Sequence, residues 1–314
     1  MKRYGRAAAS IVPRPLVTAA LRVAAVAPPS VKTMLFHRIC AALARQHAGD
    51  ATPLIRTNLG ISAGLRCDIP LAKFAHVFGR PEHSVSERST LALVALLSAE
   101  CEHFVDVGAN EGVFTFVVSQ SSQSDATIHW FEPDDELFSR MERNLLLNRI
   151  ASHGNKMAVS ASCGVATFYK NLTDDLSGSL GAFFTHKHQT REELVKTTSL
   201  SDYFIHNQMD QALVKVDVEG RASDVWEGTR TVAQNIKYLV MEIIEPDAGA
   251  ELPARIIADT GWHAYYMRDF DLVPSSDGRF DYVEPFWNWL FCRMGPADLA
   301  QKLTNTRFRV CRAN

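Results

Sequence analysis

The sequence predicts a doubly wound α/β fold, in which helices cover both faces of a mainly parallel sheet. Two observations support this prediction. Short apolar runs alternate with helical segments from His103 onward, as in a parallel sheet that is buried on both sides. The first two runs end in Asp106-Val-Gly108 and Glu132-Pro133, so polar residues and turns gather where parallel strands share one edge. With 314 residues, of which 46% are hydrophobic, the chain can bury the core that such a fold needs.

The expected elements follow one another along residues 101–314, which we predict to form the main domain. Strands are expected at His103–Val107, Thr127–Phe131, Lys156–Val159, Leu213–Val216, Tyr238–Ile243 and Trp287–Cys292. Helices are expected between them, at Gly112–Gln120, Pro133–Asn148, Ala222–Gln234 and Ala250–Thr260. The pattern also predicts an additional strand at Gly164–Lys170 and a long polar loop at Ser177–His188.

Two regions precede this domain. We predict that residues 1–50 form a basic helical arm, in which a helix at Ser30–Gln46 places apolar side chains on one face. Such a helix would pack on the body or on an oligomer partner, or it would lie on an anionic lipid surface. Residues 51–100 predict a lead-in region, with a short hairpin formed by Leu54–Asn58 and Leu65–Ile69 and a helix at Ser86–Ser98.

Charge is distributed unevenly between the arm and the rest of the chain. Eight of the 33 Lys and Arg residues lie in residues 1–49, which contain no Asp or Glu. The remaining residues therefore hold 25 bases against 35 acids. Because a body this acidic is a poor general binder of phosphate backbones, we expect no nucleic acid as the main partner.

The cysteines and the apolar runs indicate the cellular compartment. The six cysteines are scattered, with no CxxC pair and no spacing typical of a zinc site. Arg14 and Arg22 interrupt the apolar stretch near the N-terminus, so no secretory signal is expected. No run of about 20 apolar residues is present to span a membrane. We expect a cytoplasmic chain that contacts a membrane, if at all, peripherally through the basic arm.

The segment Phe104–Phe116 is the most informative, because an apolar strand runs directly into glycines that open a helix. Such a turn brings backbone N–H groups close to a ligand at the carboxyl edge of the sheet. The spacing Gly108-x-x-x-Gly112 is not the GxGxxG fingerprint of dinucleotide binding, and Asp106 would place a negative charge where a pyrophosphate should sit. A nucleotide-like cofactor with a cationic part, such as S-adenosylmethionine, fits better. A purely structural glycine turn is the alternative.

Glu132 ends the second expected strand and lies 24 residues after Gly108. An acid at about this distance accepts hydrogen bonds from the ribose hydroxyls of a nucleotide-like cofactor. Pro133 then starts the following helix, where its missing N–H has no cost. The alternative is an acid that is favoured only because it lies near a helix N-terminus.

Three further acids follow the fourth and fifth expected strands. Asp217 and Glu219 end the fourth strand beside Gly220, and in an extended chain their side chains would point the same way. Such a pair would raise one pKa, bind a cation or act as a general base for a substrate hydroxyl. A divalent metal remains an open question, with Asp217 and Glu219 as its ligands if one binds. Asp217 or Glu219 could instead cap the helix that begins near Ala222 or pair with Arg221. Glu242, at the end of the fifth strand, is expected to line the substrate side of the site, with a structural role as the alternative.

Five motifs occur in one order: Asp106–Gly112, Phe131–Pro133, Asn144–Asn148, Thr198–Asp202 and Lys215–Gly220. Together they resemble the FkbM family of S-adenosylmethionine-dependent methyltransferases, over about residues 100–292. The resemblance implies a class I methyltransferase fold with a Rossmann-like, seven-stranded sheet whose last strand is antiparallel. It also implies methyl transfer mostly to oxygen, often on sugars or sugar-bearing natural products, and so a small-molecule or glycan acceptor.

The resemblance assigns roles to residues of this chain. S-adenosylmethionine would be held by Asp106, Gly108, Asn110, Gly112 and Glu132, with Ala158 and Ser160 beside the adenine. Asp217 and Glu219 would face the acceptor as catalytic residues.

One departure from the family pattern keeps other functions open. The family commonly continues from the Gly220 position into x-Glu, whereas Arg221-Ala222 follows here. The alternative function is therefore a methyltransferase-like module that binds without catalysis and attaches through its basic arm. A nicotinamide oxidoreductase is disfavoured by the missing third glycine of its fingerprint.

Overall fold

The computed structural model describes residues 55–56, 62–63, 85–121, 124–172, 178–181, 189–244, 251–280 and 286–311. The basic arm, with its expected helix at Ser30–Gln46, lies outside the described residues. Within these described ranges, no helix combines the length and the apolar character needed to cross a membrane.

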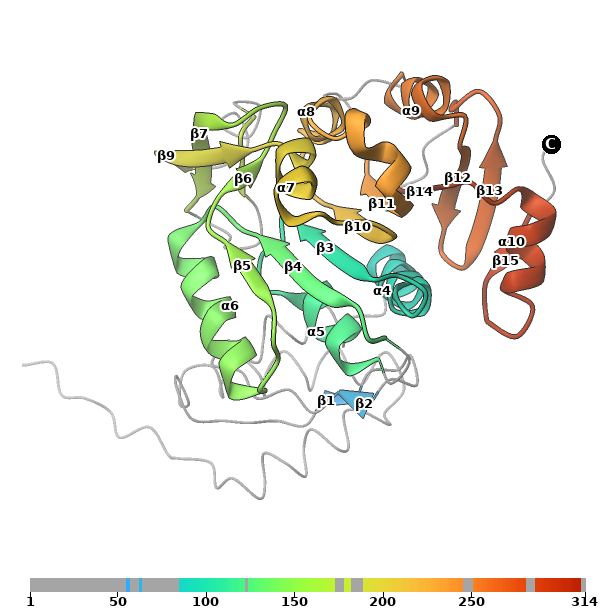
Figure 1. The fold of residues 1–314 in the computed structure, drawn as a ribbon, viewed down its shortest axis with the longest axis horizontal. Helices are drawn as coiled ribbons and strands as arrows, with labels where there is room; N and C mark the ends of the chain where they lie inside the picture. The colour runs from blue at the N-terminus through green and yellow to red at the C-terminus, as the bar shows by residue number, and fades with distance from the viewer. Residues whose placement is uncertain are drawn as a thin grey trace, which may run out of the picture.

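A nine-stranded sheet forms the centre of the described part of the chain, in the order β15-β13-β12-β14-β11-β10-β3-β4-β5 (Figure 1). From the middle outward on one side, the strands are β3 (His103–Val107), β4 (Thr127–Phe131) and β5 (His153–Asn155). On the other side they are β10 (Ala212–Val216), β11 (Ile236–Glu242), β14 (Asn288–Cys292), β12 (His263–Arg268), β13 (Asp271–Ser275) and β15 (Arg309–Val310).

The strand directions confirm the predicted fold class. Strands β5, β4, β3, β10 and β11 run parallel to one another. Strand β14 is inserted antiparallel between β11 and β12, as the expected antiparallel last strand requires. The fold is therefore that of a class I methyltransferase. The sheet has nine strands rather than the seven that the resemblance implied, and β12, β13 and β15 lie outside the strand segments that the sequence predicted.

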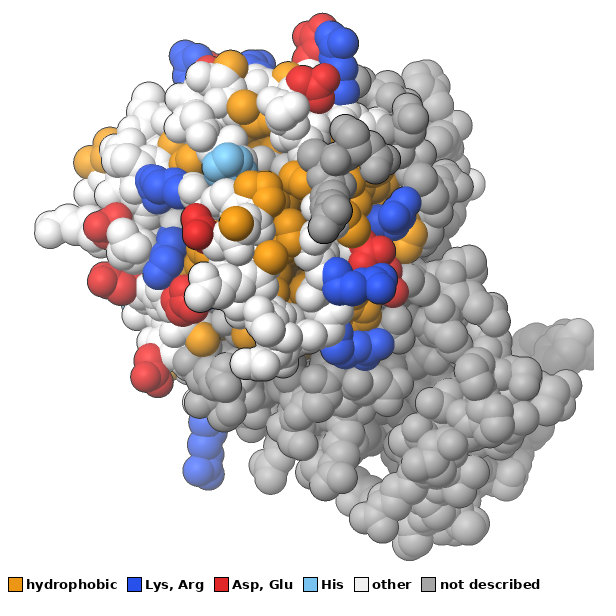
Figure 2. Space-filling view, turned by 90° about the vertical axis from the view of Figure 1, so that its right-hand side faces the viewer, with side chains coloured by type: hydrophobic (Ala, Val, Ile, Leu, Met, Phe, Trp, Pro, Cys, Tyr) orange, Lys and Arg blue, Asp and Glu red, His pale blue; other side chains and the backbone are white. Residues whose placement is uncertain are grey.

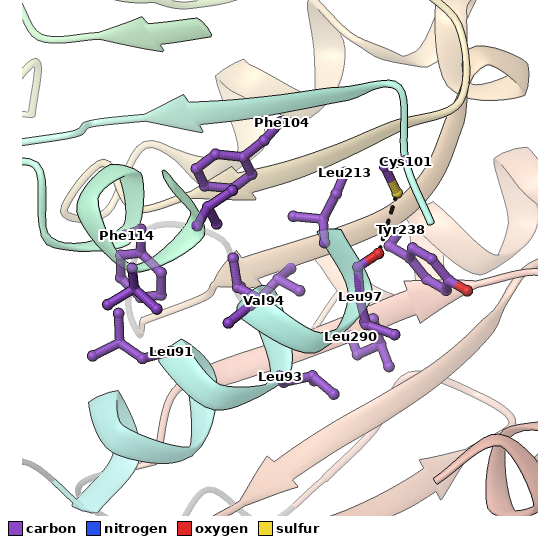
Figure 3. Packing of buried hydrophobic residues seen from close by; sticks show 14 of the residues in the cluster. Leu91, Leu93, Val94, Leu97, Cys101, Phe104, Phe114, Leu213, Tyr238 and Leu290 are labelled. Atoms are coloured by element: carbon purple, nitrogen blue, oxygen red, sulfur yellow. Dashed lines mark hydrogen bonds between the residues drawn. The ribbon is translucent and has the colours of Figure 1, made fainter. Parts of the chain in front are cut away.

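Helices cover both faces of this sheet, because successive side chains of each strand point to opposite faces. On one face, Phe104 and Leu213 pack with apolar side chains of α4 (Val85–Ser98) and α5 (Val113–Gln120) (Figure 3). The helices α6 (Asp135–Leu147) and α10 (Pro296–Lys302) contribute to the same cluster. On the other face, Val105 and Val214 pack with α7 (Leu200–Asn207), α8 (Ala222–Glu227), η2 (Arg230–Asn235) and α9 (Leu252–Thr260). The doubly wound prediction is confirmed.

A four-stranded sheet is inserted between β5 and α7, in the order β6-β9-β7-β8. Its strands are β6 (Ala158–Val159), β7 (Gly164–Asn171), β8 (Gly178–Ser179) and β9 (Thr190–Thr198). The expected extra strand at Gly164–Lys170 is confirmed as β7. The inserted sheet stands beside the upper ends of β4 and β5 in Figure 1.

Two expected elements differ from the structure. The sequence predicted that Lys156–Val159 would be the third strand of the main sheet along the chain. That strand is instead β5, and Ala158–Val159 pairs with β9 in the inserted sheet. Gly154 of β5 lies so close to Trp130 that a Cβ would be 2.3 Å from its ring, so this strand lacks an apolar signal. The expected helix at Ala222–Gln234 is divided into α8 and η2 at Gly228, where the backbone approaches the Ser160 carbonyl.

A hairpin is present in the lead-in region, but its second strand differs from the expected one. Strands β1 (Ile55–Arg56) and β2 (Ser62–Ala63) pair antiparallel, whereas the second strand was expected at Leu65–Ile69, outside the described residues. Within the expected polar loop at Ser177–His188, residues 178–179 form β8.

On the face that carries the C-terminal strands and α10, hydrophobic side chains gather in a central area bordered by charged ones (Figure 2).

Candidate active site

A pocket opens at the carboxyl ends of β3, β4 and β10, the edge at which doubly wound folds bind their ligands. The turns after these strands form one wall, and the inserted sheet forms the opposite wall. The residues from the strand ends and α6 are Gly108, Asn110, Phe131, Glu132, Pro133, Asp134, Glu136, Leu137, Arg140, Asp217, Val218, Glu219 and Arg221. Those from the segment 157–180 are Met157, Ala158, Val159, Phe168, Lys170, Asn171, Gly178, Ser179 and Leu180.

Gly108 holds two strand ends together. Its φ of 75° lies in the left-handed region, and its N–H donates to the Phe131 carbonyl at 3.1 Å. A Cβ at this position would lie 1.8 Å from the Asp217 carbonyl oxygen. Glycine is therefore required here by backbone packing, in addition to any approach of a ligand.

Asp106 and Gly112 support the turn from behind and do not line the pocket. The Asp106 carboxylate accepts from the Thr115 backbone N–H at 3.1 Å and from the Thr115 hydroxyl at 2.8 Å, which anchors the first turn of α5. Burial raises the pKa of Asp106 to about 6. Gly112 is the N-cap residue of α5 with a φ of 82°. Both residues shape the loop that carries Asn110, rather than facing the pocket themselves.

Glu132 faces the pocket from the end of β4 while remaining 4% exposed. One carboxylate oxygen accepts from the Asn110 backbone N–H at 2.8 Å, and the other accepts from the Asp134 backbone N–H at 2.8 Å. Burial raises the pKa of this carboxyl to about 7, although both hydrogen bonds favour its ionised form. Each carboxylate oxygen can accept a further hydrogen bond, so Glu132 can also bind two adjacent hydroxyls.

Two sets of contacts fasten the inserted sheet over the pocket. The Lys170 ammonium of β7 lies 2.7 Å from the carboxylate of Asp134, which caps α6, and 3.4 Å from that of Glu136. On the opposite side, the Ser179 hydroxyl donates to the Glu219 carbonyl at 2.7 Å. The Gly181 N–H in turn donates to the Ser179 hydroxyl oxygen at 2.9 Å. The inserted sheet therefore bridges α6 and the turn after β10.

Carboxylate oxygens of Asp217, Glu219 and Glu242 lie within 4.8 Å of one another. Asp217 and Glu219 line the pocket, whereas Glu242, which was expected to line the site, is not among the lining residues. The fully buried Lys215 places its ammonium 3.2 Å from the Asp217 carboxylate. Burial would raise the pKa of Asp217, but this ammonium and a hydrogen bond with Glu242 lower it below its usual value. Burial and the negative charges of Asp217 and Glu219 raise the pKa of Glu242 well above its usual value. Asp217 is thus the ionised member of the pair that it forms with Glu242.

The backbone conformation that brings Glu219 to this cluster differs from the one that the sequence predicted. An extended chain was expected to align it with Asp217, but Glu219 has a φ of 48° in the left-handed region, followed by Gly220 at 86°. The tight turn brings its carboxylate beside that of Asp217 and exposes its carbonyl to Ser179.

The two residues expected beside an adenine are placed differently. Ala158 lies on β6 and lines the pocket next to Met157 and Phe168. Ser160 does not line it, and its N–H donates to the Thr198 carbonyl at 2.9 Å.

The comparisons with known proteins decide the family. The family model described as the methyltransferase FkbM domain matches residues 106–261, which run from the Gly108 turn through both clusters of site residues. This chain carries an FkbM methyltransferase domain. The match begins at Asp106 and contains every residue to which the sequence assigned a role.

Individual relatives cover smaller parts of the chain. The 31-O-demethyl-FK506 methyltransferase FkbM of Streptomyces tacrolimicus is 30% identical over 117 residues, which are 37% of this chain and 42% of the relative. The crystal structure of methyltransferase FkbM from Methylobacillus flagellatus matches 61% of this chain and 43% of its own, at 13% identity and a TM-score of 0.40. M. capricolum TrmK, in complex with S-adenosyl-homocysteine, matches 64% of this chain and 66% of its own, at 12% identity and a TM-score of 0.37. The chain thus spans about two fifths of the length of the two FkbM relatives.

Two motifs of the FkbM domain serve the fold. Ser199 caps α7 by accepting from the Asp202 N–H at 3.0 Å, and its hydroxyl donates to the Asp202 carboxylate at 2.5 Å. Asn148 donates from its side chain to the Asn144 carbonyl at 2.7 Å and ends α6. Ala222, the departure from the family pattern, is buried at the start of α8 and does not line the pocket.

Sequence reasoning missed three side chains of the FkbM domain that shape the pocket. Lys215 stood inside a quoted motif, and a lysine within an otherwise apolar strand was the signal that could have singled it out. Lys170 and Ser179 carried no such signal, because their partners are 36 and 40 residues away along the chain. Only the pairing of β7 with β8 brings the two residues to the same wall.

Proposed function

We propose that this chain is an S-adenosylmethionine-dependent methyltransferase that methylates a hydroxyl of a sugar or polyketide-type small molecule. The observation that carries the proposal is Glu132, a buried carboxylate that faces the pocket at the end of β4. It lies on the same pocket wall as Asp217 and Glu219. The relative named 31-O-demethyl-FK506 methyltransferase supports a hydroxyl acceptor on a polyketide-type molecule.

The residues present fit S-adenosylmethionine. Its ribose hydroxyls match the acceptor capacity of Glu132, and its ammonium and sulfonium groups favour an acidic pocket. The pocket lining offers five acids against three bases, so it is acidic overall. Met157, Ala158 and Phe168 provide an apolar wall against which an adenine ring can pack.

When bound, S-adenosylmethionine supplies a methyl group on cationic sulfur, which a hydroxyl oxygen attacks without covalent help from the protein. Glu132 and the loop after β3 would hold the cofactor, and the inserted sheet would form the opposite wall of its site. The Asp217 carboxylate, kept ionised by Lys215, accepts the proton of the acceptor hydroxyl. Positioning and proton acceptance are therefore the contributions of this chain to the rate.

The acidic lining also favours a small hydroxyl compound over RNA, whose phosphates the pocket would repel. The alternative of a binding module without catalysis rests on the Arg221-Ala222 departure. Because Ala222 packs in the apolar core, while Asp217 and Glu219 remain at the pocket, we favour the enzyme.

Transfer of a tritiated methyl group from S-adenosylmethionine tests the proposal. The acceptor panel contains free sugars, glycosylated polyketides, O-demethylated macrolides and transfer RNA. We expect label in a hydroxyl compound, and a loss of about 10²–10⁴-fold in Asp217→Asn, because general-base assistance has this size. The matched control is Asp210→Asn, an exposed acid outside the pocket, which should keep the full rate.

The other outcomes are distinct. Label found only in RNA would contradict the acceptor class. Binding of S-adenosylhomocysteine with no transfer to any acceptor would favour the non-catalytic module. Failure to bind S-adenosylhomocysteine at all would contradict the methyltransferase itself.

A further inference from the structure

Three polar side chains form a row across neighbouring strands at the edge of the pocket. Asp217 directly follows β10. The last residue of β10 pairs with Met241, so Asp217 lies beside Glu242, the last residue of β11. Glu242 pairs in turn with Asn288, the first residue of β14. Residues directly opposite each other in an antiparallel pair send their side chains to the same face of the sheet. The Asn288 amide is therefore directed to the face on which the Glu242 carboxyl lies.

Glu219 joins two members of this row, so that three carboxyls meet at this edge of the sheet. The carboxylate oxygens of Asp217, Glu219 and Glu242 lie within 4.8 Å of one another. The ammonium of Lys215 lies 3.2 Å from the Asp217 carboxylate. Each of the three side chains offers a carboxylate oxygen that a cation can bind.

Asn288 provides an independent sign of a missing ligand. The residue is 2% exposed, and its Oδ1 has no hydrogen-bond partner among the described residues. The large majority of buried side-chain polar atoms in proteins have a hydrogen-bond partner, so a buried amide oxygen without a donor calls for an explanation. A cation beside Glu242 would satisfy this oxygen.

We propose that Asp217, Glu219, Glu242 and Asn288 bind one divalent cation through their side-chain oxygens. Carboxylate and amide oxygens are hard donors, which suit Mg²⁺, Mn²⁺ and Ca²⁺ rather than thiophilic metals. The site uses the ends of three adjacent strands, so its spacing is fixed by the sheet itself.

The position of this site gives the cation a role that rests on the proposed function. Asp217 and Glu219 line the pocket, so an ion held by them lies at its wall. There it can bind the oxygen of an acceptor hydroxyl and favour loss of its proton. The binding site itself does not depend on this role.

Manganese binding to the intact chain, followed by electron paramagnetic resonance after removal of metals with a chelator, tests the proposal. Calorimetric titrations with Mg²⁺ and Ca²⁺ accompany it. We expect saturable binding of one Mn²⁺ per chain, weakened about tenfold or more in Glu242→Gln and in Asn288→Leu. The matched control, Glu227→Gln on α8, changes an acid that is ion-paired with Arg230 and should bind like the wild type.

Absence of saturable Mn²⁺ binding to the wild type at millimolar concentrations would overturn the site. Binding that is unchanged in Glu242→Gln would also overturn it, even if Asn288→Leu failed to fold. Because the titration needs neither cofactor nor acceptor, its failure is separate from failure of the methyltransferase proposal. A chain that binds Mn²⁺ but transfers no methyl group keeps the site and loses the proposed function.

Discussion

At the ends of β3 and β4, backbone N–H groups position the acid that lines the pocket, whereas at the ends of β10 and β11 charged side chains do so. On the first side, which we call the cofactor side, Glu132 receives both of its hydrogen bonds from backbone N–H groups. On the second, the acceptor side, Asp217 depends on the ammonium of Lys215 and on the Glu242 carboxyl. A wall made by backbone keeps its shape when neighbouring side chains change. A wall made by side chains can change its chemistry with one substitution.

The largest expected effect concerns the junction of the two sides, at Gly108. Gly108→Ala should destabilise the fold by more than about 4 kcal/mol, because it adds left-handed strain and a Cβ 1.8 Å from the Asp217 carbonyl oxygen. Gly261 has a similar φ of 70° with nothing within 4 Å of its Cβ position, so Gly261→Ala isolates the strain, about 1–2 kcal/mol. Urea unfolding measures both. Equal losses in the two variants would show that the turns do not pack as described.

The cofactor side should depend on one carboxylate and on its ionisation. Glu132→Gln should weaken S-adenosylhomocysteine binding by about 1.5–3 kcal/mol, since charged acceptors form the stronger hydrogen bonds. The Glu136→Gln variant, at an exposed acid of the same pocket, should bind almost normally. Calorimetric titration provides both values. If the Glu132→Gln variant folds and binds like the wild type, Glu132 has no role on the cofactor side.

The raised pKa of Glu132 adds a pH dependence with a defined sign. Ribose hydroxyls donate to the ionised form, so wild-type affinity for S-adenosylhomocysteine should rise as pH rises through about 7. The unliganded fold responds oppositely. Because the folded pKa exceeds the unfolded one, the stability that the protonated carboxyl contributes is present at low pH and is lost as pH rises through about 7. Affinity and unfolding measured from about pH 5 to 8 check both slopes. Glu132→Gln should flatten the affinity slope and reduce the stability slope, to which the raised pKa values of Asp106 and Glu242 also contribute.

The smallest effect is expected at the fastening of the inserted sheet, which spans both sides of the pocket. Lys170→Met removes the contact with Asp134 and should speed amide exchange at residues 178–181 by about threefold to tenfold, corresponding to about 1 kcal/mol. Lys196→Met, at an exposed lysine of β9, is the control. Hydrogen exchange followed by mass spectrometry measures the rates. Unchanged exchange in Lys170→Met would mean that Ser179 alone holds the sheet.

The contrast between backbone and side-chain walls also explains what the sequence could predict. Glycines, strand-end acids and apolar periodicity are local signals, so the strands β3, β4, β10, β11 and β14, the Gly108 turn and the placement of Glu132 at the edge of the sheet were predictable. The inserted sheet depends on pairing between distant strands, and β9 is a polar strand without an apolar alternation. Asn288 acquires meaning only through its register with Glu242, which no local pattern encodes.

A structure of this chain with S-adenosylhomocysteine would show whether Glu132 binds the ribose of the cofactor. We expect the ribose hydroxyls to lie within hydrogen-bond distance of the Glu132 carboxylate, with the adenine against Ala158 and the sulfur directed toward Asp217. Binding elsewhere on the chain would contradict the proposed cofactor site. So would binding in this pocket with the ribose away from Glu132.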